Sequence, residues 1–94
     1  MTQSTLYLVQ ASYHHTPQII EELTNYFDKD DQIVFMGDST AQLSVSICQQ
    51  FGSISCLCYE KDLIDAETLA HVNVLNYDQF ADLVLQFNRC ISLK

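Results

Sequence analysis

Four short runs of strand-forming residues, separated by segments with helical patterns, most constrain what this chain folds into. The runs are apolar and rich in β-branched or aromatic residues, as in strands covered on both faces. Because strand and helix alternate along the chain, the pattern predicts β-α-β units with right-handed crossovers. The expected fold is a small three-layer α/β domain with a mainly parallel, four-stranded sheet. The expected strands are 5–11, 32–36, 53–59 and 72–77.

The first helix is predicted to begin at Thr16, a candidate N-cap, with Pro17 in its first position. Apolar residues at helical spacing continue this helix over 19–27. Residues 28–31, with sequence DKDD, then form a solvated acidic turn. Segment 40–51 alternates as a strand would, but its apolar residues also fill one arc of a helix, and its place between two strands favours the helix.

Glycine and capping residues mark the remaining boundaries. Gly52 fits the position just past the end of the second helix. Segment 60–71 is expected to be a loop with one or two helical turns, and the last helix is expected over 78–91. Asn76 or Asp78 is the candidate cap of that helix.

Length and charge limit the classes of function. A chain of 94 residues, with no linker or repeat, is expected to form one domain over 1–94. Its net charge of −8 disfavours direct binding to nucleic acid or to anionic lipid. Hydrophobic residues make up 48% of the chain against 17% charged residues, so burial against a partner protein is expected.

Cellular location is inferred from what the sequence lacks. No run approaches the roughly 20 apolar residues of a membrane span, and the first ten residues lack the pattern of a secretory signal. We therefore expect a cytoplasmic protein whose cysteines are free thiols. The cysteines contain no C-x-x-C pair, and the histidines complete no zinc pattern, so we expect no metal. Two glycines build no phosphate-binding loop, and we expect no cofactor.

Each cysteine has a structural and a chemical interpretation. Cys56 and Cys58 are two apart on an expected strand, so they share a face that should be dry. Core packing is favoured for Cys56, whereas Cys58 lies nearer the edge of the sheet where function collects. Cys48 lies in the apolar arc of the second helix, and Cys90 lacks an activating group. Cys58 and Cys48 remain the two candidates for a sulfur-carrying thiol.

In parallel α/β sheets, function collects where the strands end. The expected strand ends here are SYHH, GDST, YEKD and NYDQ. Asp38 is a general acid, a partner contact or, in the favoured interpretation, a helix N-cap. His14 and His15 are a proton relay or, as favoured, exposed loop or interface residues, with Tyr13 completing an aromatic contact patch.

The second and last helices carry apolar arcs broader than one sheet face needs. Some of this apolar surface is therefore expected to meet other subunits, with Phe51 and Leu85 as candidate interface residues. No residue is expected to be catalytic in its own right.

The chain as a whole resembles the TusB/DsrH family, small subunits of bacterial sulfur-relay complexes. The resemblance runs nearly end to end. It is carried by the opening strand LYLVQAS, the turn and strand DDQIVFMGDS, the stretch CYEKDLID and the segment VNVLNYDQFADLV. It implies a flavodoxin/Rossmann-like fold of the DsrE/DsrF/DsrH type.

In the TusB branch, the resemblance implies a subunit of a heterohexamer with two copies each of TusB, TusC and TusD. That complex accepts persulfide sulfur from TusA and passes it to TusE, toward 2-thiolation of the wobble uridine of certain tRNAs. In the DsrH branch, related complexes serve sulfur oxidation. In both branches the principal sulfur-carrying cysteine belongs to a sibling subunit, TusD or DsrE.

Two departures from the family pattern favour a scaffold over a thiol carrier. Some DsrH members have a cysteine in the first helix, and the aligned position here is Leu23. The family's usual Asp-Gly after the second strand here reads Asp38-Ser39. The sequence thus predicts a non-catalytic structural subunit of a TusBCD-like complex. The alternatives are a DsrH-like subunit, a persulfide carrier using Cys58 or Cys48, and an interaction module with no tie to sulfur.

Overall fold

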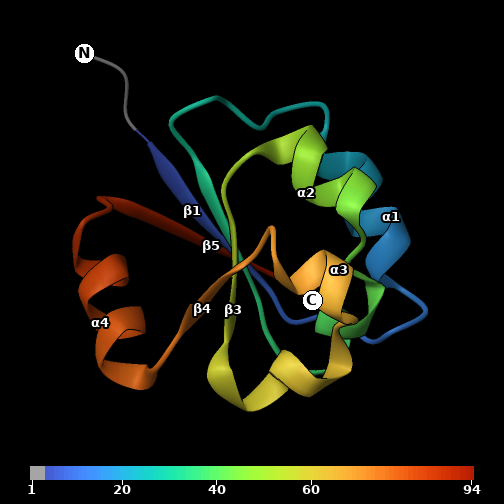
Figure 1. Cartoon of the computed structure of the whole chain (residues 1–94). Coiled ribbons are helices and arrows are strands. Elements are labelled where there is room, and N and C mark those ends of the chain that lie inside the picture. Colours follow the sequence, from blue (N-terminus) through green and yellow to red (C-terminus); the bar gives the residue numbers. More distant parts are fainter. Residues whose placement is uncertain (1–3) are drawn as a thin grey trace.

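Five parallel strands form a single sheet in the computed structural model, which describes residues 4–94 (Figure 1). All four strand pairs are parallel, and the order across the sheet is β4-β3-β2-β1-β5. The predicted parallel α/β fold is therefore confirmed. The strands are β1 (Thr5–Val9), β2 (Gln32–Phe35), β3 (Ile54–Leu57), β4 (Asn73–Leu75) and β5 (Arg89–Leu93).

The fifth strand corrects the prediction of a four-stranded sheet. Residues 89–91 were expected to end the last helix, but that helix, α4 (Tyr77–Leu85), stops earlier and the chain returns as β5. Strand β5 pairs with β1 along its whole length, from Thr5 opposite Arg89 to Val9 opposite Leu93. The apolar residues of 87–93 suit a helix or a strand by spacing alone. Pairing with the otherwise open edge of β1 decides between them.

The helices cover both faces of the sheet and complete the predicted three layers (Figure 1). Helices α1 (Thr16–Leu23), α2 (Val45–Phe51) and α3 (Ala66–Leu69) lie on one face, and α4 lies on the other. Two 3-10 helices, η1 (Gly37–Gln42) and η2 (Cys58–Leu63), follow β2 and β3 directly. Segment 60–71 was expected to be a loop with one or two helical turns. In the structure η2 overlaps the start of this segment, and α3 lies inside it.

Alternation along the strands divides the core into two halves. Side chains of one parity, including Tyr7, Phe35 and Cys56, belong to the apolar cluster shared with α1 and α2. Side chains of the other parity, such as Leu6 and Val34, point toward the α4 face and are fully buried. Both faces of the central strands are thus removed from water, which is the usual condition for a parallel sheet.

Two predicted helix starts differ in the structure. The N-cap of α1 is His15, and the Thr16 hydroxyl instead donates to the Ser12 carbonyl at 2.7 Å. Pro17, predicted in the first helical position, is therefore the second residue of α1, still within its first turn. Segment 40–51 is interrupted, because η1 ends at Gln42 and the Ser44 hydroxyl, accepting from the Ile47 N–H at 3.3 Å, starts α2 afresh.

Other boundary predictions are confirmed or corrected by local geometry. Gly52 ends α2 with φ 82°, a conformation that favours glycine. Asp38 is not an N-cap, because it lies inside η1, whose first residue is Gly37. Asp31, expected in a solvated turn, is only 3% exposed. Asn76 is the cap of α4 and forms a capping box with Gln79.

Replacing this cap should destabilise the fold measurably. In Asn76→Ala the Gln79 N–H loses its acceptor, now 2.8 Å away, and the free energy of unfolding should fall by about 1 kcal/mol. Urea unfolding followed by circular dichroism measures the change. Gln86→Ala, at the exposed other end of α4, is the control and should change stability little. Equal losses in the two variants would contradict the capping role.

Candidate functional site

The carboxyl ends of the strands converge on an open cavity of about 410 Å³. Its lining residues follow β1, β2, β3 and β4 at or just beyond their last residues. Parallel strands all end at one edge of the sheet, and in open α/β folds this edge carries the ligand or partner site. The cavity is lined by Gln10, Met36, Gly37, Leu57, Glu60 and Tyr77.

Hydrogen bonds between these loops hold the cavity walls together. The Gly37 N–H donates to Glu60 Oε1 at 2.9 Å, joining η1 to η2. Gly37 has φ 65°, so a side chain there would strain the backbone that presents this N–H. On the other wall, Gln10 Nε2 donates to Met36 Sδ at 3.4 Å. The site is thus formed from three loops tied to one another.

An exposed tyrosine pair flanks the cavity. The rings of Tyr59, in η2, and Tyr77, at the start of α4, lie 4.9 Å apart between centroids and are tilted by 32°. The two side chains are 68% and 60% exposed. Tyrosines are enriched at the centres of protein interfaces, where a rigid ring fills a pocket and the hydroxyl finds a partner. This pair is therefore suited to protein contact.

The sequence carries one signal for this pair, because both tyrosines belong to expected strand ends. Tyr59 opens the strand end YEKD and Tyr77 lies in NYDQ, two of the four segments expected at the carboxyl edge. The proximity of the two rings depends on the crossover from β3 to β4, which no local pattern reveals.

Tyr13, His14 and His15 lie in the exposed turn before α1, outside the cavity lining. The rings of Tyr13 and His14 meet edge to face at 5.5 Å. The Tyr13 carbonyl accepts from Gln42 Nε2 at 2.8 Å, which ties this turn to η1, where the exposed Asp38 lies. The structure thus brings together the segments that follow β1 and β2, where the predicted strand ends SYHH and GDST lie.

The two predicted apolar interface residues do not share a surface. Phe51 is only 8% exposed and packs edge to face on Phe27 at 5.1 Å, within the core. It is therefore a core residue, because the apolar arc of α2 faces the sheet. Leu85 is 83% exposed on α4, on the opposite side of the sheet from α2 (Figure 1). Leu85 alone of the two is available to a partner.

The four thiols divide by burial. Cys56 is fully buried and Cys48 is buried, whereas Cys58, at the start of η2, is half-buried and Cys90, on β5, is exposed. Burial, with a smaller effect from the Glu60 carboxylate, raises the pKa of Cys56 to about 11. Burial also raises the pKa of the Cys48 thiol. Both stay protonated at neutral pH and are poor nucleophiles, so Cys48 is unsuited to carry sulfur and Cys58 is the better-placed candidate.

Among residues 4–94, no three histidine, cysteine, aspartate or glutamate side chains are arranged to hold a metal ion. Within the same range, no helix has the length and apolar character needed to cross a membrane.

Comparison with known proteins identifies the fold. The structure matches the crystal structure of the YchN protein from E. coli with a TM-score of 0.63, over 99% of this chain and 100% of that chain. The chain has the YchN/DsrE-like fold. Sequence identity to YchN is 13%, so this likeness concerns the fold alone. No family model matches the sequence, and no curated protein matches it.

The thiols should differ in their reaction with iodoacetamide. In the native protein, Cys90 should be alkylated fastest and Cys58 more slowly, while Cys48 and Cys56 should react only after unfolding, because they are buried and protonated. Mass spectrometry of peptides from timed samples measures each rate. Rapid native alkylation of Cys48 or Cys56 would contradict the assigned burial.

Alkaline pH should destabilise the fold through Cys56. Its folded pKa is raised from 9.0 to about 11, so the stabilisation is complete below pH 9 and is lost as pH rises through 11. The full loss is on the order of 3 kcal/mol. Urea unfolding at a series of pH values measures it. Cys56→Ala should be less stable at neutral pH by about 1 kcal/mol, yet lose less stability on alkalinisation, whereas the exposed control Cys90→Ala should follow the parent protein.

Proposed function

We propose that this chain is a non-catalytic structural subunit of a TusBCD-like sulfur-relay complex. Its role would be to complete a hetero-oligomer that receives persulfide sulfur from a TusA-like donor and passes it to a TusE-like acceptor, toward tRNA 2-thiolation. The observation that carries the proposal is the DsrE-like fold over nearly the whole chain, which agrees with the TusB/DsrH resemblance of the sequence.

The thiols support a scaffold rather than a carrier. A persulfide carrier needs an accessible cysteine with thiolate character. Cys48 and Cys56 are buried with raised pKa values, and Leu23, the position where some DsrH members have cysteine, is fully buried in the core. The sulfur-bearing cysteine of the complex would then belong to a TusD-like partner.

The carboxyl edge supplies the surface for such a partner. The exposed rings of Tyr59 and Tyr77 stand beside a cavity of about 410 Å³, a combination that suits an inserted partner side chain. We infer that this edge, with Tyr13 on its rim, contacts TusC- and TusD-like subunits.

Co-expression with the host's TusC- and TusD-like proteins, followed by native mass spectrometry, tests the assignment. A hetero-oligomer containing all three chains is the expected result. A stable monomer with no affinity for either partner would overturn the proposal. Transfer assays with TusA- and TusE-like proteins test the tRNA pathway against the DsrH-like alternative, which serves sulfur oxidation.

The tyrosine pair should dominate partner affinity. Replacing both residues, as Tyr59→Ser with Tyr77→Ser, should weaken assembly at least tenfold, since buried aromatic anchors account for most interface energy. Tyr26→Ser, which removes a 45% exposed tyrosine from the opposite edge of the sheet, is the control. Titration by isothermal calorimetry measures both. If the double variant and the Tyr26→Ser control bound the partners equally well, the interface would not lie at this edge.

Cys58 sustains a second candidate function, that of a persulfide carrier, because it is half-buried and directly follows β3 at the same edge. In the assembled complex, Cys58→Ser separates the two functions. A scaffold keeps full sulfur transfer in this variant, whereas a carrier loses it while the complex still assembles.

A further inference from the structure

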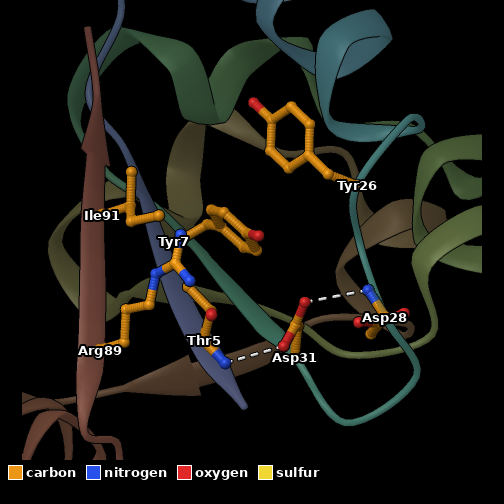
Figure 2. A pocket seen from close by; sticks show the side chains of 7 residues that line it. All are labelled: Thr5, Tyr7, Tyr26, Asp28, Asp31, Arg89 and Ile91. Carbon is orange, nitrogen blue, oxygen red and sulfur yellow. Dashed lines mark hydrogen bonds between the residues drawn. The ribbon is translucent and has the colours of Figure 1, made fainter. Parts of the chain in front are cut away.

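A second cavity, of about 460 Å³, opens at the amino edge of the sheet, opposite the tyrosine pair (Figure 2). It lies beside the first residues of β1 and β5 and the loop that leads into β2. Its volume falls in the range of small-molecule sites, about 300–1,000 Å³. Its lining combines charged and aromatic groups, with Tyr7 and Ile91 side by side on neighbouring strands and Tyr26 across from them.

A buried carboxylate forms one wall of this cavity. Asp31 is 3% exposed, and its Oδ1 accepts from the Thr5 N–H at 2.7 Å while its Oδ2 accepts from the Asp28 N–H at 2.9 Å. These bonds fix the carboxylate in one orientation (Figure 2). A carboxylate offers about four acceptor positions, so acceptor capacity remains for a ligand. The exposed Asp28 side chain adds a second negative charge to the same wall.

A positive charge lies on the other side. Arg89 is the first residue of β5 and pairs in register with Thr5, and Figure 2 shows it reaching in from β5 while the aspartates lie beyond Tyr7. Burial raises the pKa of the Tyr7 hydroxyl most, the Asp31 charge raises it further, and the Arg89 charge opposes them. The Tyr7 hydroxyl is thus influenced by both charges, and Tyr7, Asp31 and Arg89 line the same cavity.

This separation of charge selects against simple ions. A small anion drawn to Arg89 would also face two carboxylates, and a small cation drawn to the carboxylates would also face the guanidinium. A ligand with an ammonium at one end and a carboxylate a few bonds away satisfies both walls. The Tyr7 and Tyr26 rings and the Ile91 side chain leave an apolar surface for the rest of such a ligand.

We propose that this cavity binds a free α-amino acid with an apolar side chain. Its ammonium donates to Asp28 and Asp31, its carboxylate accepts from the Arg89 guanidinium, and its side chain packs on Tyr7, Tyr26 and Ile91. This site is distinct from the carboxyl edge and does not depend on assembly with sulfur-relay partners. The isolated chain can therefore be tested directly.

The test uses L-leucine and two analogues that each lack one charge. 3-Methylbutylamine lacks the carboxylate, and 4-methylpentanoate lacks the ammonium. Binding is followed by ¹H–¹⁵N NMR titration, with shifts expected at the backbone amides of Tyr7, Asp31 and Ile91. L-Leucine should bind at least tenfold more tightly than either analogue, because each lost charge removes a charge-assisted hydrogen bond.

Two substitutions test the walls separately. Arg89→Gln should weaken L-leucine binding at least tenfold but should not weaken the amine binding, because the guanidinium repels the ammonium. Asp28→Asn should weaken leucine and the amine together. Both side chains are exposed, so the fold should survive. Asp82→Asn, on α4 across the sheet, is the matched control and should bind leucine as the parent does.

Three outcomes would overturn the proposal. One is the absence of any shift with millimolar L-leucine in the folded protein. Another is equal affinity for 3-methylbutylamine and for L-leucine, which would mean that the ligand carboxylate contributes nothing and that the cavity binds an amine alone. The third is unchanged leucine binding in Arg89→Gln. None of these results bears on hetero-oligomer formation, so failure here and failure of the proposed function are distinguishable.

Discussion

The pairing of β1 with both β2 and β5 is the constraint on which the other features of this fold depend. Strand β1 lies inside the sheet, with β2 on one side and β5 on the other. Because both pairings are parallel, the chain reaches each of these positions by a crossover connection. The crossovers supply α1 and α4 on opposite faces. Full burial of Leu6 and Val34 beneath α4 then becomes possible, as does the dense cluster beneath α1 and α2. Without β5, the α4 crossover would have no strand to return to.

Parallel alignment also separates the chemistry of the molecule into two edges. Loops that follow strands gather at the carboxyl edge, where Gly37 and Glu60 bond and the Tyr59 and Tyr77 rings meet. Segments that precede strands gather at the amino edge, where Asp31 binds the Thr5 N–H. The carboxyl edge is aromatic and partly apolar, whereas the amino edge places opposite charges around Tyr7. The two edges therefore suit different kinds of ligand.

The sequence predicted the features that depend on local pattern. Strands β1 to β4, the Asn76 cap and the glycine after α2 follow from composition, spacing and capping chemistry. Strand β5 was missed because residues up to 91 fit the last helix by spacing, and residues 89–93 become a strand only through pairing with β1. Phe51 was assigned to an interface because an apolar arc does not indicate what covers it. The amino-edge cavity was missed because Asp31 and Arg89 are far apart in the sequence and come to line the same cavity only through the strand order of the sheet.

The position of β5 in the strand order has a consequence during synthesis. Strands β1 to β4 leave the ribosome before β5, so β1 presents an open edge of unpaired N–H and C=O groups until Arg89–Leu93 emerges. The same delay leaves the face over Leu6 uncovered, because α4 has no returning strand to hold it. Until then the chain carries an unpaired strand edge and uncovered apolar side chains, the two features that make folding intermediates prone to aggregation.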